Sequence, residues 1–521
     1  MSAITPQTEL RILKCPIESD NNNQLTFSSE KEQFKYFDKL PNIKVDNFTY
    51  QRKDSIIRFP AHIDSIITYN YVMYQNEAYT NKWFYAFITN MEYVNDNMTY
   101  ITIKTDVYQT WQFNIEWKKS FVEREHVNND TLGLHTVPEN LETGAYKTYD
   151  HMTDGYNGSM TLVSLSTVGP SDLENYSMNM YNGIPTPGVY CKWSSISNFK
   201  SFITSLNNNG KIDALISVFI CPTWLTGTGG SVYIDQSNTP ATQSLGISRI
   251  SSLDGYNPKN NKMLCYPYCY IGLSNGVGQF STYKQERWNL TSNEMKIEMK
   301  GVLVPSASIK AYPLNYNGDS NCYDESITIG KFPQLAWSND LYTNWQTQNG
   351  VNIGGIRLSA TESAIAKGVL QLGVGAAMVS SGNIVGGSFI GGGISDIYGA
   401  VQQDYQHSLV PNAVEGSVNS GDVTTMIGAN RLHAYRIGIT SEYAKIIDDY
   451  FTAYGYKVNS YKVPNITGRL NWNYVKTNNA NIEGDIPEGD INEIKSLFNR
   501  GITLWHNPST YLDYSQNNTI I

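Results

Sequence analysis

The sequence predicts a mainly β protein with a few short helices, a β-rich α+β chain of several domains with a long apolar loop insertion. At 521 residues, the chain exceeds the length at which one hydrophobic core stops growing. Aromatic residues make up 12% of it and include 37 tyrosines, whereas charged residues make up only 16%, below the roughly 25% usual for soluble proteins. Several segments also alternate apolar and polar residues with the period of two that is typical of strands.

The clearest strand pattern lies within residues 48–127. Apolar and polar side chains alternate over residues 83–92 and again over residues 101–107. Residues 95–97 (Asn-Asp-Asn) supply a turn between them, because Asn and Asp tolerate a left-handed backbone, and the arrangement predicts a β-hairpin. Residues 111–117 continue the alternation and predict a further strand, whose apolar face would hold Trp111, Phe113, Ile115 and Trp117.

Residue patterns predict four helices, at residues 171–180, 197–206, 441–453 and 490–499. Ser441 is placed as the N-cap of the third helix because its hydroxyl can accept a hydrogen bond from a free backbone N–H. Gly210, Gly455 and Gly501 follow the last three helices, at positions where glycine commonly ends a helix.

Changes of composition along the chain predict five parts. The first is an N-terminal β domain, the second is an inserted outer domain that is β-rich with short helices, and the third is a return segment. The fourth is a glycine-rich apolar loop and the fifth is a C-terminal α+β domain. These parts span residues 1–127, 128–318, 319–349, 350–428 and 429–521.

The charge pattern disfavours tight binding of nucleic acid. The formal net charge is −9, and no run of basic residues is longer than a pair such as Lys118-Lys119. A protein that grips phosphate needs a basic patch, which this sequence lacks. Mild acidity does suit a wall along which DNA slides, because weak repulsion prevents the polyanion from sticking.

The cysteines and the N-terminus predict folding in a cytoplasm. The N-terminal residues have no positive stretch followed by an apolar one, so no secretory signal is expected. The six cysteines form neither a CxxC pair nor a regular framework, and a chain of this length needs no disulfide staples. Reduced thiols are therefore expected at Cys15, Cys191, Cys221, Cys265, Cys269 and Cys322.

The most informative stretch of the sequence lies within residues 350–428. No charged residue occurs between Lys367 and Asp396, and this run, long enough to span a bilayer, mixes Gly, Ala and Ser with large apolar residues. An interior glycine costs a helix about 0.5–1 kcal/mol relative to alanine, yet glycine is common where helices pack closely in lipid. A capping-box pattern at residues 359–362 precedes a helical face that would hold Ile365, Val369, Leu372 and Met378.

Two interpretations of this stretch remain open. One is a glycine-rich buried loop, and the low hydropathy of residues 380–383 argues against a permanent transmembrane anchor. The other is a conditional membrane-inserting loop. An exposed apolar patch of this length would aggregate, so such a loop would have to be hidden, most simply inside a symmetric oligomer, until lipid is available.

No catalytic, metal or cofactor site is predicted. The sequence has no GxSxG motif, and residues 227–230 lack the lysine and the following helix of a phosphate-binding loop. Cys265 and Cys269 have no histidine nearby in sequence. The histidines form no HExxH or HxxxH pair and are scattered, at His62, His126, His135, His151, His407, His433 and His506.

Pairs of acidic residues leave a cell-wall glycosidase open as an alternative, because that reaction needs two carboxylates about 5–10 Å apart. The simpler expectation places Asp448 and Asp449 on the exposed face of a helix. Residues 123–125 (Glu-Arg-Glu) are expected to form an ion pair at a sheet edge or an interface. The aromatic row at residues 111–117 is expected to pack in the core rather than to bind carbohydrate.

Several segments carry a resemblance to a known family. They are YVMYQNEAYTNKWFYAFITNMEY, DVYQTWQFNIEWKKSFVEREHV, LCYPYCY, YGYKVN, INEIKSLF and FNRGITLWH. With them the chain resembles the distal tail knob proteins of phi-29-like short-tailed bacteriophages. The resemblance is strong over residues 64–127 and 454–506, and the apolar loop keeps its place. Residues 128–260 match poorly, so a host-surface contact made there cannot be transferred.

The resemblance implies a hexameric β-walled tube at the tail tip, to which residues 1–127 and 429–521 would contribute. Apolar loops would plug its lumen, then leave it and help to breach the host membrane so that the genome is ejected. Lys367 and Asp396, near the loop ends, leave the inserted depth open. The carried-over loop residues are Ile365, Gly368, Val369, Leu370, Leu372, Gly373, Val374, Gly375, Met378, Val379, Ile384, Val385, Gly386, Phe389, Ile390, Ile394 and Ile397.

The partners and location follow from the same resemblance. The expected partners are further copies of the chain, the tail tube or lower collar protein of the same virion, and lipid of the host membrane. Double-stranded DNA would pass through without specific binding. The expected location is the distal tail tip of a virion assembled in a bacterial cytoplasm. A receptor-binding adhesin without membrane activity remains the main alternative.

Overall fold

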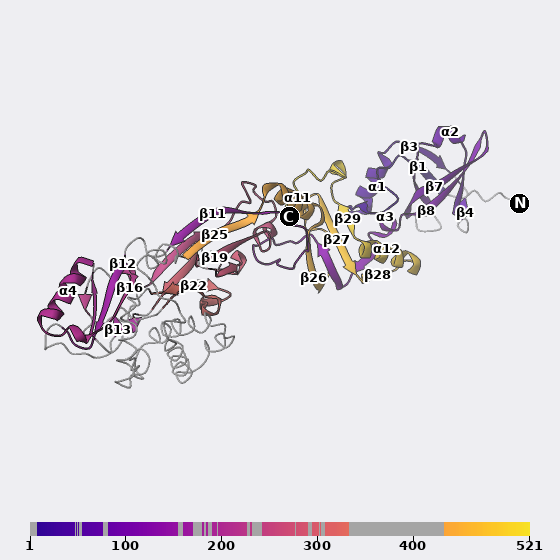
Figure 1. Cartoon of the computed structure of the whole chain (residues 1–521). Helices are drawn as coiled ribbons and strands as arrows, with labels where there is room; N and C mark the ends of the chain where they lie inside the picture. The colour runs from indigo at the N-terminus through magenta and orange to yellow at the C-terminus, as the bar shows by residue number, and fades with distance from the viewer. Residues whose placement is uncertain are drawn as a thin grey trace. The chain divides into compact units, whose positions relative to one another are not determined.

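The computed structural model of the chain describes residues 8–332 and 432–521, apart from short gaps at 47, 49, 52–54, 77–81, 155–159, 170–179, 182–183, 186–189, 195, 227–229, 232–241, 277, 290–293, 302 and 304–307. The chain divides into two compact units built from separate segments (Figure 1). Unit 1 comprises Met1–Glu142, Pro258–Met263 and Glu442–Ile521. Unit 2 comprises Thr143–Asn257 and Leu264–Ser441. The mainly β fold class is confirmed.

A seven-stranded antiparallel sheet forms one half of unit 1. Apolar side chains on both of its faces are buried, because successive residues of a strand point to opposite faces. Leu10 and Val72 lie in the core on one face, and Leu13 and Met73 lie in the core on the other. The strand order is β3 (Asn42–Asp46), β1 (Thr8–Leu13), β6 (Tyr71–Asn76), β7 (Trp83–Asn95), β8 (Met98–Thr105), β5 (Ile56–Phe59) and β4 (Tyr50–Gln51).

The second sheet of unit 1 joins the start of the chain to its end. Its strand order is β2 (Asn23–Leu25), β29 (Ile502–Trp505), β27 (Trp472–Asn478), β10 (Ser120–Glu125) and β26 (Tyr456–Lys462), and β2 pairs with β29 in parallel. A two-stranded sheet pairs β9 (Ile115–Trp117) with β28 (Ile482–Gly484). The helices of unit 1 are α1 (Glu30–Asp38), α2 (Ile63–Ile66), α3 (Val107–Trp111), α11 (Ser441–Tyr454) and α12 (Glu488–Arg500).

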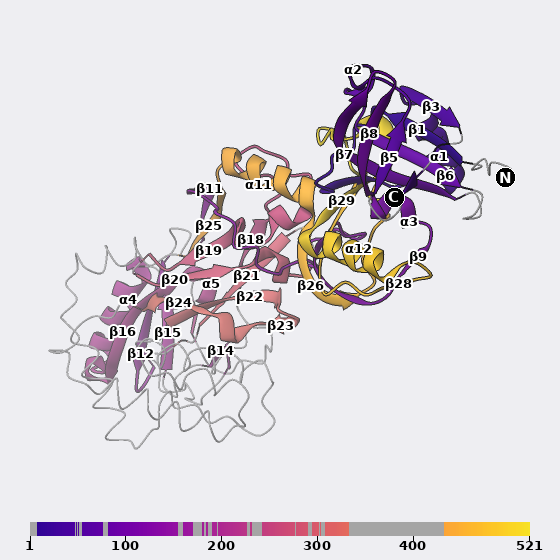
Figure 2. The ribbon, with the colours of Figure 1, turned by 90° about the vertical axis from the view of Figure 1, so that its right-hand side faces the viewer.

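The described residues of unit 2 form three larger sheets and one β-ladder of two short strands. The first sheet has the order β11 (Tyr146–Asp154), β25 (Leu432–Ile439), β19 (Cys269–Ser274) and β20 (Phe280–Tyr283). Strands β11, β25 and β19 run side by side in Figures 1 and 2. The second has the order β16 (Leu215–Pro222), β12 (Met160–Ser166), β15 (Tyr190–Ser194) and β17 (Gly230–Ser231).

The third sheet of unit 2 has the order β18 (Gln243–Ser248), β21 (Glu294–Lys300), β22 (Ser308–Tyr316) and β23 (Asp319–Asn321), with β24 (Ile327–Lys331) also paired to β22. The short ladder joins β13 (Met180–Tyr181) to β14 (Ile184–Pro185). The α-helices in the part of this unit that the structure describes are α4 (Ile196–Asn208) and α5 (Thr223–Thr226).

Local sequence signals account for much of this secondary structure. The predicted hairpin is confirmed as β7 and β8, in which Asn95 pairs with Met98. The helices predicted at 197–206, 441–453 and 490–499 are confirmed as α4, α11 and α12. Gly210, Gly455 and Gly501 all follow these helices with positive φ. The helix predicted at 171–180 falls almost entirely on residues 170–179, outside the described residues.

The strand predicted at residues 111–117 is wrong in its first half. Asp106 caps α3 by accepting a hydrogen bond from the backbone N–H of Gln109, so a helix continues to Trp111. Trp111, Ile115 and Trp117 are partly buried against the apolar core beneath α12. The expectation of core packing is therefore confirmed for these three residues, although helix and strand both contribute to it.

Candidate functional site

The predicted membrane-active residues, from Ile365 to Ile397, all lie outside the described residues. The strands that bracket them are described, and both belong to unit 2. Before them, β24 pairs with β22, and after them β25 pairs with β11 and β19. None of the helices within the described ranges combines the length and apolar character that a bilayer span needs. Residues 333–431 thus connect two strands that are each anchored in the sheets of unit 2.

A buried polar site lies around residues 258–263, which belong to unit 1. These six residues, here called the crossing segment, interrupt the sequence of unit 2. Four consecutive residues of the segment bind to three carboxylates, here called the acidic clasp, which consists of Asp130, Glu139 and Asp448.

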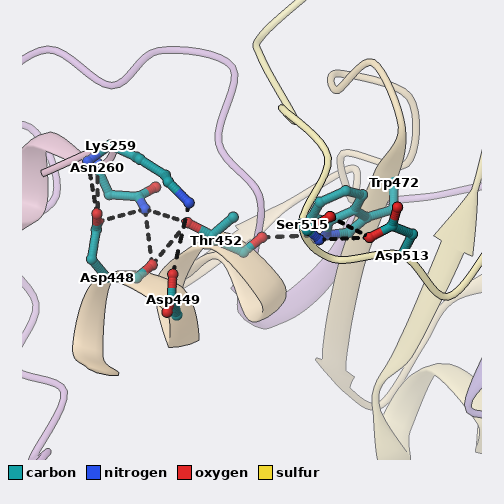
Figure 3. Close-up of polar contacts among 8 residues, drawn as sticks. All are labelled: Lys259, Asn260, Asp448, Asp449, Thr452, Trp472, Asp513 and Ser515. Atoms are coloured by element: carbon teal, nitrogen blue, oxygen red, sulfur yellow. Dashed lines mark hydrogen bonds and ion pairs between the residues drawn. The ribbon is translucent and has the colours of Figure 1, made fainter. Parts of the chain in front are cut away.

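Asp448, on α11, binds Lys259 and Asn260 of the crossing segment (Figure 3). One of its oxygens accepts from the backbone N–H of Lys259 at 2.7 Å, and the other accepts from the backbone N–H of Asn260 at 3.1 Å and from its side-chain Nδ2 at 2.8 Å. The Asn260 amide also donates to Thr452 Oγ1 at 2.9 Å. Asp448 is fully buried, so these donors replace the water that the carboxylate loses on folding.

The expectation that Asp448 lies on an exposed helix face is wrong. Its position in α11 shares the buried stripe of Ala444, Ile447 and Phe451, because residues three and four apart lie on one helix face. Asp449 does point to solvent, with 53% of its side chain exposed, and lies 3.7 Å from Lys259 Nζ. The signal was therefore present in the sequence, as an acidic residue within an apolar stripe.

Glu139 and Asp130 hold the rest of the crossing segment. The Glu139 carboxylate, 1% exposed, pairs with Lys262 and with Arg124, and it accepts from the backbone N–H of Lys457 at 2.9 Å. Asp130 accepts from the backbone N–H of Asn261 at 2.9 Å and from the Tyr456 hydroxyl at 2.7 Å. Burial raises the pKa of Asp130, and these hydrogen bonds oppose that rise.

The ion pairs expected at residues 123–125 exist, but the expectation of a sheet edge is wrong. These residues belong to β10, which lies inside its sheet between β27 and β26. Arg124 pairs with Glu139, and the buried Glu125 pairs with Lys462, so both contacts lie within unit 1. Glu123, 38% exposed, pairs with Lys476 at 3.0 Å. The arrangement gives these carboxylates cationic partners and a structural role.

His126 is buried next to α11 as a neutral ring. Its Nδ1 accepts from the backbone N–H of Tyr474 at 2.8 Å, so Nε2 carries the proton and donates to the Thr452 carbonyl at 3.0 Å. The Trp472 indole donates to the same carbonyl at 3.2 Å. Burial, reinforced by the charge of Arg469, lowers the pKa of His126 to about 3. A proton on Nδ1 would break the bond to Tyr474.

Replacing His126 by glutamine is expected to destabilise unit 1 at neutral pH but to reduce its sensitivity to acid. The folded-state pKa is lowered, so the stability contributed by the neutral ring is present above the unfolded-state pKa and is lost as the pH falls toward 3. Each pH unit below about 6.5 lowers the free energy of unfolding of the original protein by about 1.4 kcal/mol through this group. The glutamine variant has no ring to titrate at this position and does not lose this contribution. In urea unfolding, the difference between the free energies of unfolding of the two proteins should decrease by about 2 kcal/mol between about pH 6.5 and about pH 5. A constant difference would contradict this.

A second buried network surrounds Asp106, which is fully buried. The Tyr71 hydroxyl donates to it at 2.9 Å, and the Gln24 side chain donates at 3.3 Å. Gln109 links the network onward by donating to the Gln24 side-chain oxygen at 2.8 Å. Burial raises the pKa of Asp106 to about 6, although its hydrogen bonds lower it. This network connects β2, β6 and α3 in unit 1.

The cysteines are buried within the two units and do not resemble catalytic thiols. All six cysteines are buried and free of disulfides. Burial raises the pKa of Cys191 to about 12, which is unfavourable for a nucleophile. Among the described residues, no group of three or more His, Cys, Asp or Glu side chains could hold a metal ion. The clasp and the networks around it position segments of chain and present no paired nucleophile and base.

Two families of known proteins match large parts of the chain. Residues 234–519, more than half of the chain, match the family described as the C-terminal domain of the tail knob protein gp9 of Bacillus phage phi29. The chain belongs to the phi29 tail knob family. Residues 6–117, which include the seven-stranded sheet, match the N-terminus of the caudoviral major tail protein. The predicted resemblance is therefore confirmed.

Whole-chain relatives agree with this family. The tail knob proteins gp9 of Bacillus phages phi29 and PZA are 26% and 27% identical to the chain, each over 96% of both proteins. That of Bacillus phage B103 is 25% identical over 98% of both. The tail knob protein gp12 of bacteriophage C1 has the same fold, with a TM-score of 0.61 over 99% of this chain and 100% of that one at 15% identity. The protein is a structural component of a phage tail.

Proposed function

We propose that the protein is a wall-forming subunit of an oligomeric tail knob, whose apolar segment closes the lumen and later enters the host membrane. The observation that carries the proposal is the run of residues 368–395, which contains no charged side chain in a chain that is otherwise rich in polar residues. Such a run is unfavourable in water and favourable in lipid. The bracketing strands β24 and β25 give the segment two fixed attachment points in unit 2.

The domain plan of the proposal assigns the wall to residues 1–127 and 429–521. Support comes from the match of residues 6–117 to a major tail protein, since such a sheet fits contact with the tail tube or lower collar. Residues 128–318 form the outer domain, and residues 319–349 form the return segment to the tube. The wall offers little attraction to DNA because the net charge is −9. Six buried free thiols fit assembly in a reducing host cytoplasm.

Deleting residues 365–397 is expected to abolish release of a trapped dye from liposomes by the purified knob. The deletion removes the apolar run and leaves the paired strands β24 and β25 unchanged. The number of subunits per particle should match that of the original protein, because the deletion lies outside the described sheets. Leakage that persists after the deletion would contradict membrane entry. A purified protein that remains monomeric by mass measurement would contradict the tube.

A finer variant keeps the length of the segment. Leu372→Asp with Val374→Asp places two charges in the run, and each costs about 2.5–3.5 kcal/mol at the centre of a bilayer. Leakage should therefore fall by at least tenfold. The matched control is Ile446→Asp in α11, because Ile446 is an apolar residue that is already 61% exposed. The control should leak as the original protein does, and equal leakage by all three would favour an adhesin.

A further inference from the structure

Two histidines from distant parts of the sequence meet on the first sheet of unit 2. His151 lies on β11 and His433 on β25, and His151 Nε2 and His433 Nδ1 share a hydrogen bond of 3.0 Å. The two rings are nearly parallel, at 15°, with centroids 5.2 Å apart. Tyr435 pairs with His151 and Thr153 pairs with His433 across the two strands, so both imidazoles project from one face of the sheet.

The sheet holds the pair in place. Leu432 and Ala434 alternate with His433 along β25 and are fully buried, so the histidine must face the other side of the sheet. Since β25 pairs with β11 on one side and with β19 on the other, its backbone is fixed by two ladders. The Tyr435 ring lies 4.6 Å from the His151 ring at an angle of 7° and orients it by stacking.

The separation of the two nitrogens matches that of neighbouring ligands of a metal ion. With metal–nitrogen bonds of about 2.0–2.1 Å, two ligands lie about 2.9 Å apart at a square-planar centre and about 3.4 Å apart at a tetrahedral one. A bound ion would replace the shared hydrogen bond, with the protons on His151 Nδ1 and His433 Nε2, so that both facing nitrogens offer a lone pair to the metal. Imidazole is a favoured ligand for zinc, copper and nickel.

We propose that His151 and His433 bind a divalent transition-metal ion that bridges β11 and β25. Among the described residues no third His, Cys, Asp or Glu joins the pair, so water or another oxygen ligand completes the coordination. A bound ion would link β25, the strand that follows residue 431, to β11. The two histidines lie 282 positions apart in sequence. Binding to the folded state alone would stabilise this pairing by mass action.

The test is titration of the tag-free, full-length protein with Ni²⁺, Zn²⁺ or Cu²⁺ salts in isothermal calorimetry. We expect one ion per chain, an affinity at least about tenfold lower in His151→Ala and in His433→Ala, and no binding in the double variant. Electron paramagnetic resonance of the Cu²⁺ complex should show two coordinating nitrogens in the original protein and one in each single variant. Both histidines lie on a partly exposed face, and the thermal transition of each metal-free variant establishes that it is folded.

The matched control is His62→Ala. In the described structure His62 has no second imidazole beside it. Its Nδ1 lies 3.5 Å from Asp64 Oδ2 instead. Its loss should leave the affinity unchanged. The proposal is overturned if the double variant binds the ions as tightly as the original protein, if His62→Ala removes the binding, or if the original protein takes up no ion at millimolar concentration.

Discussion

Replacing Asp448 by alanine is expected to destabilise unit 1 by about 3–5 kcal/mol. The change removes a fully buried carboxylate and leaves the backbone N–H groups of Lys259 and Asn260 without their acceptor. A buried unsatisfied donor costs about 1–3 kcal/mol, and the hydrogen bonds of a charged group are the stronger kind. The Asn260 side chain also loses its 2.8 Å bond. The crossing segment should then detach from α11.

Hydrogen exchange of the intact chain measures this effect at the two backbone amides themselves. The amides of Lys259 and Asn260 should exchange at least about a hundredfold faster in Asp448→Ala, and urea should unfold unit 1 at a lower concentration. The control is Asp449→Ala, one residue along the same helix (Figure 3). Its side chain is 53% exposed and its ion pair with Lys259 is 3.7 Å long, so the change should stay within about 0.5 kcal/mol. Equal effects of the two variants would refute the assignment of the clasp.

Replacing Glu139 by glutamine should destabilise unit 1 by a similar amount, about 3–5 kcal/mol. Glutamine keeps the size of the side chain and an oxygen for the Lys457 N–H, so the change isolates the charge. Arg124 and Lys262, whose side chains are 11% and 3% exposed, would lose their shared carboxylate. An uncompensated buried cation is strongly unfavourable, because the site excludes the water that would otherwise solvate it.

Two further variants make the result for Glu139 specific. Glu123→Gln breaks a pair with Lys476 that is more than one third exposed on both sides, and should change stability by less than about 1 kcal/mol. Lys262→Met removes one of the two cations that lose their carboxylate partner in Glu139→Gln. The methionine side chain still offers an apolar chain to the rings of Phe451 and Tyr456. The double variant Glu139→Gln with Lys262→Met should be more stable than the sum of the single effects predicts. Simple additivity in urea unfolding would show that the pair is not coupled.

Short-range sequence patterns predicted much of the secondary structure of this chain correctly. The hairpin of β7 and β8 follows from alternation and an Asn-Asp-Asn turn, and both signals lie within about twenty residues. The ends of α11 and α12 follow from the glycines behind them. Residues 111–117 misled the same reasoning, because an aromatic row with period two also fits one turn of helix followed by a short strand. The cap at Asp106 decided between the two.

The site depended on partners that no local pattern contains. Asp448 was expected to be exposed because acidic residues usually are, and its stripe in α11 was the only local sign against this. Its partner in the crossing segment lies 189 positions earlier in sequence. Glu139 likewise meets Lys262 and Arg124 only because three separate segments pack together. Whether a buried charge is stable depends on such partners, and they were set by folding at long range.

By itself, the sequence determined the mainly β character, the hairpin, three helices with their glycine stops, the uncharged run at residues 368–395 and the phage tail family. Each of these depends on residues that are close in the chain or on similarity along it. Tertiary structure alone decided the parallel pairing of β2 with β29, the burial of Asp448 and the meeting of His151 with His433. The reason is physical: period and capping act within a few residues, whereas desolvation and charge pairing depend on whatever folding brings together.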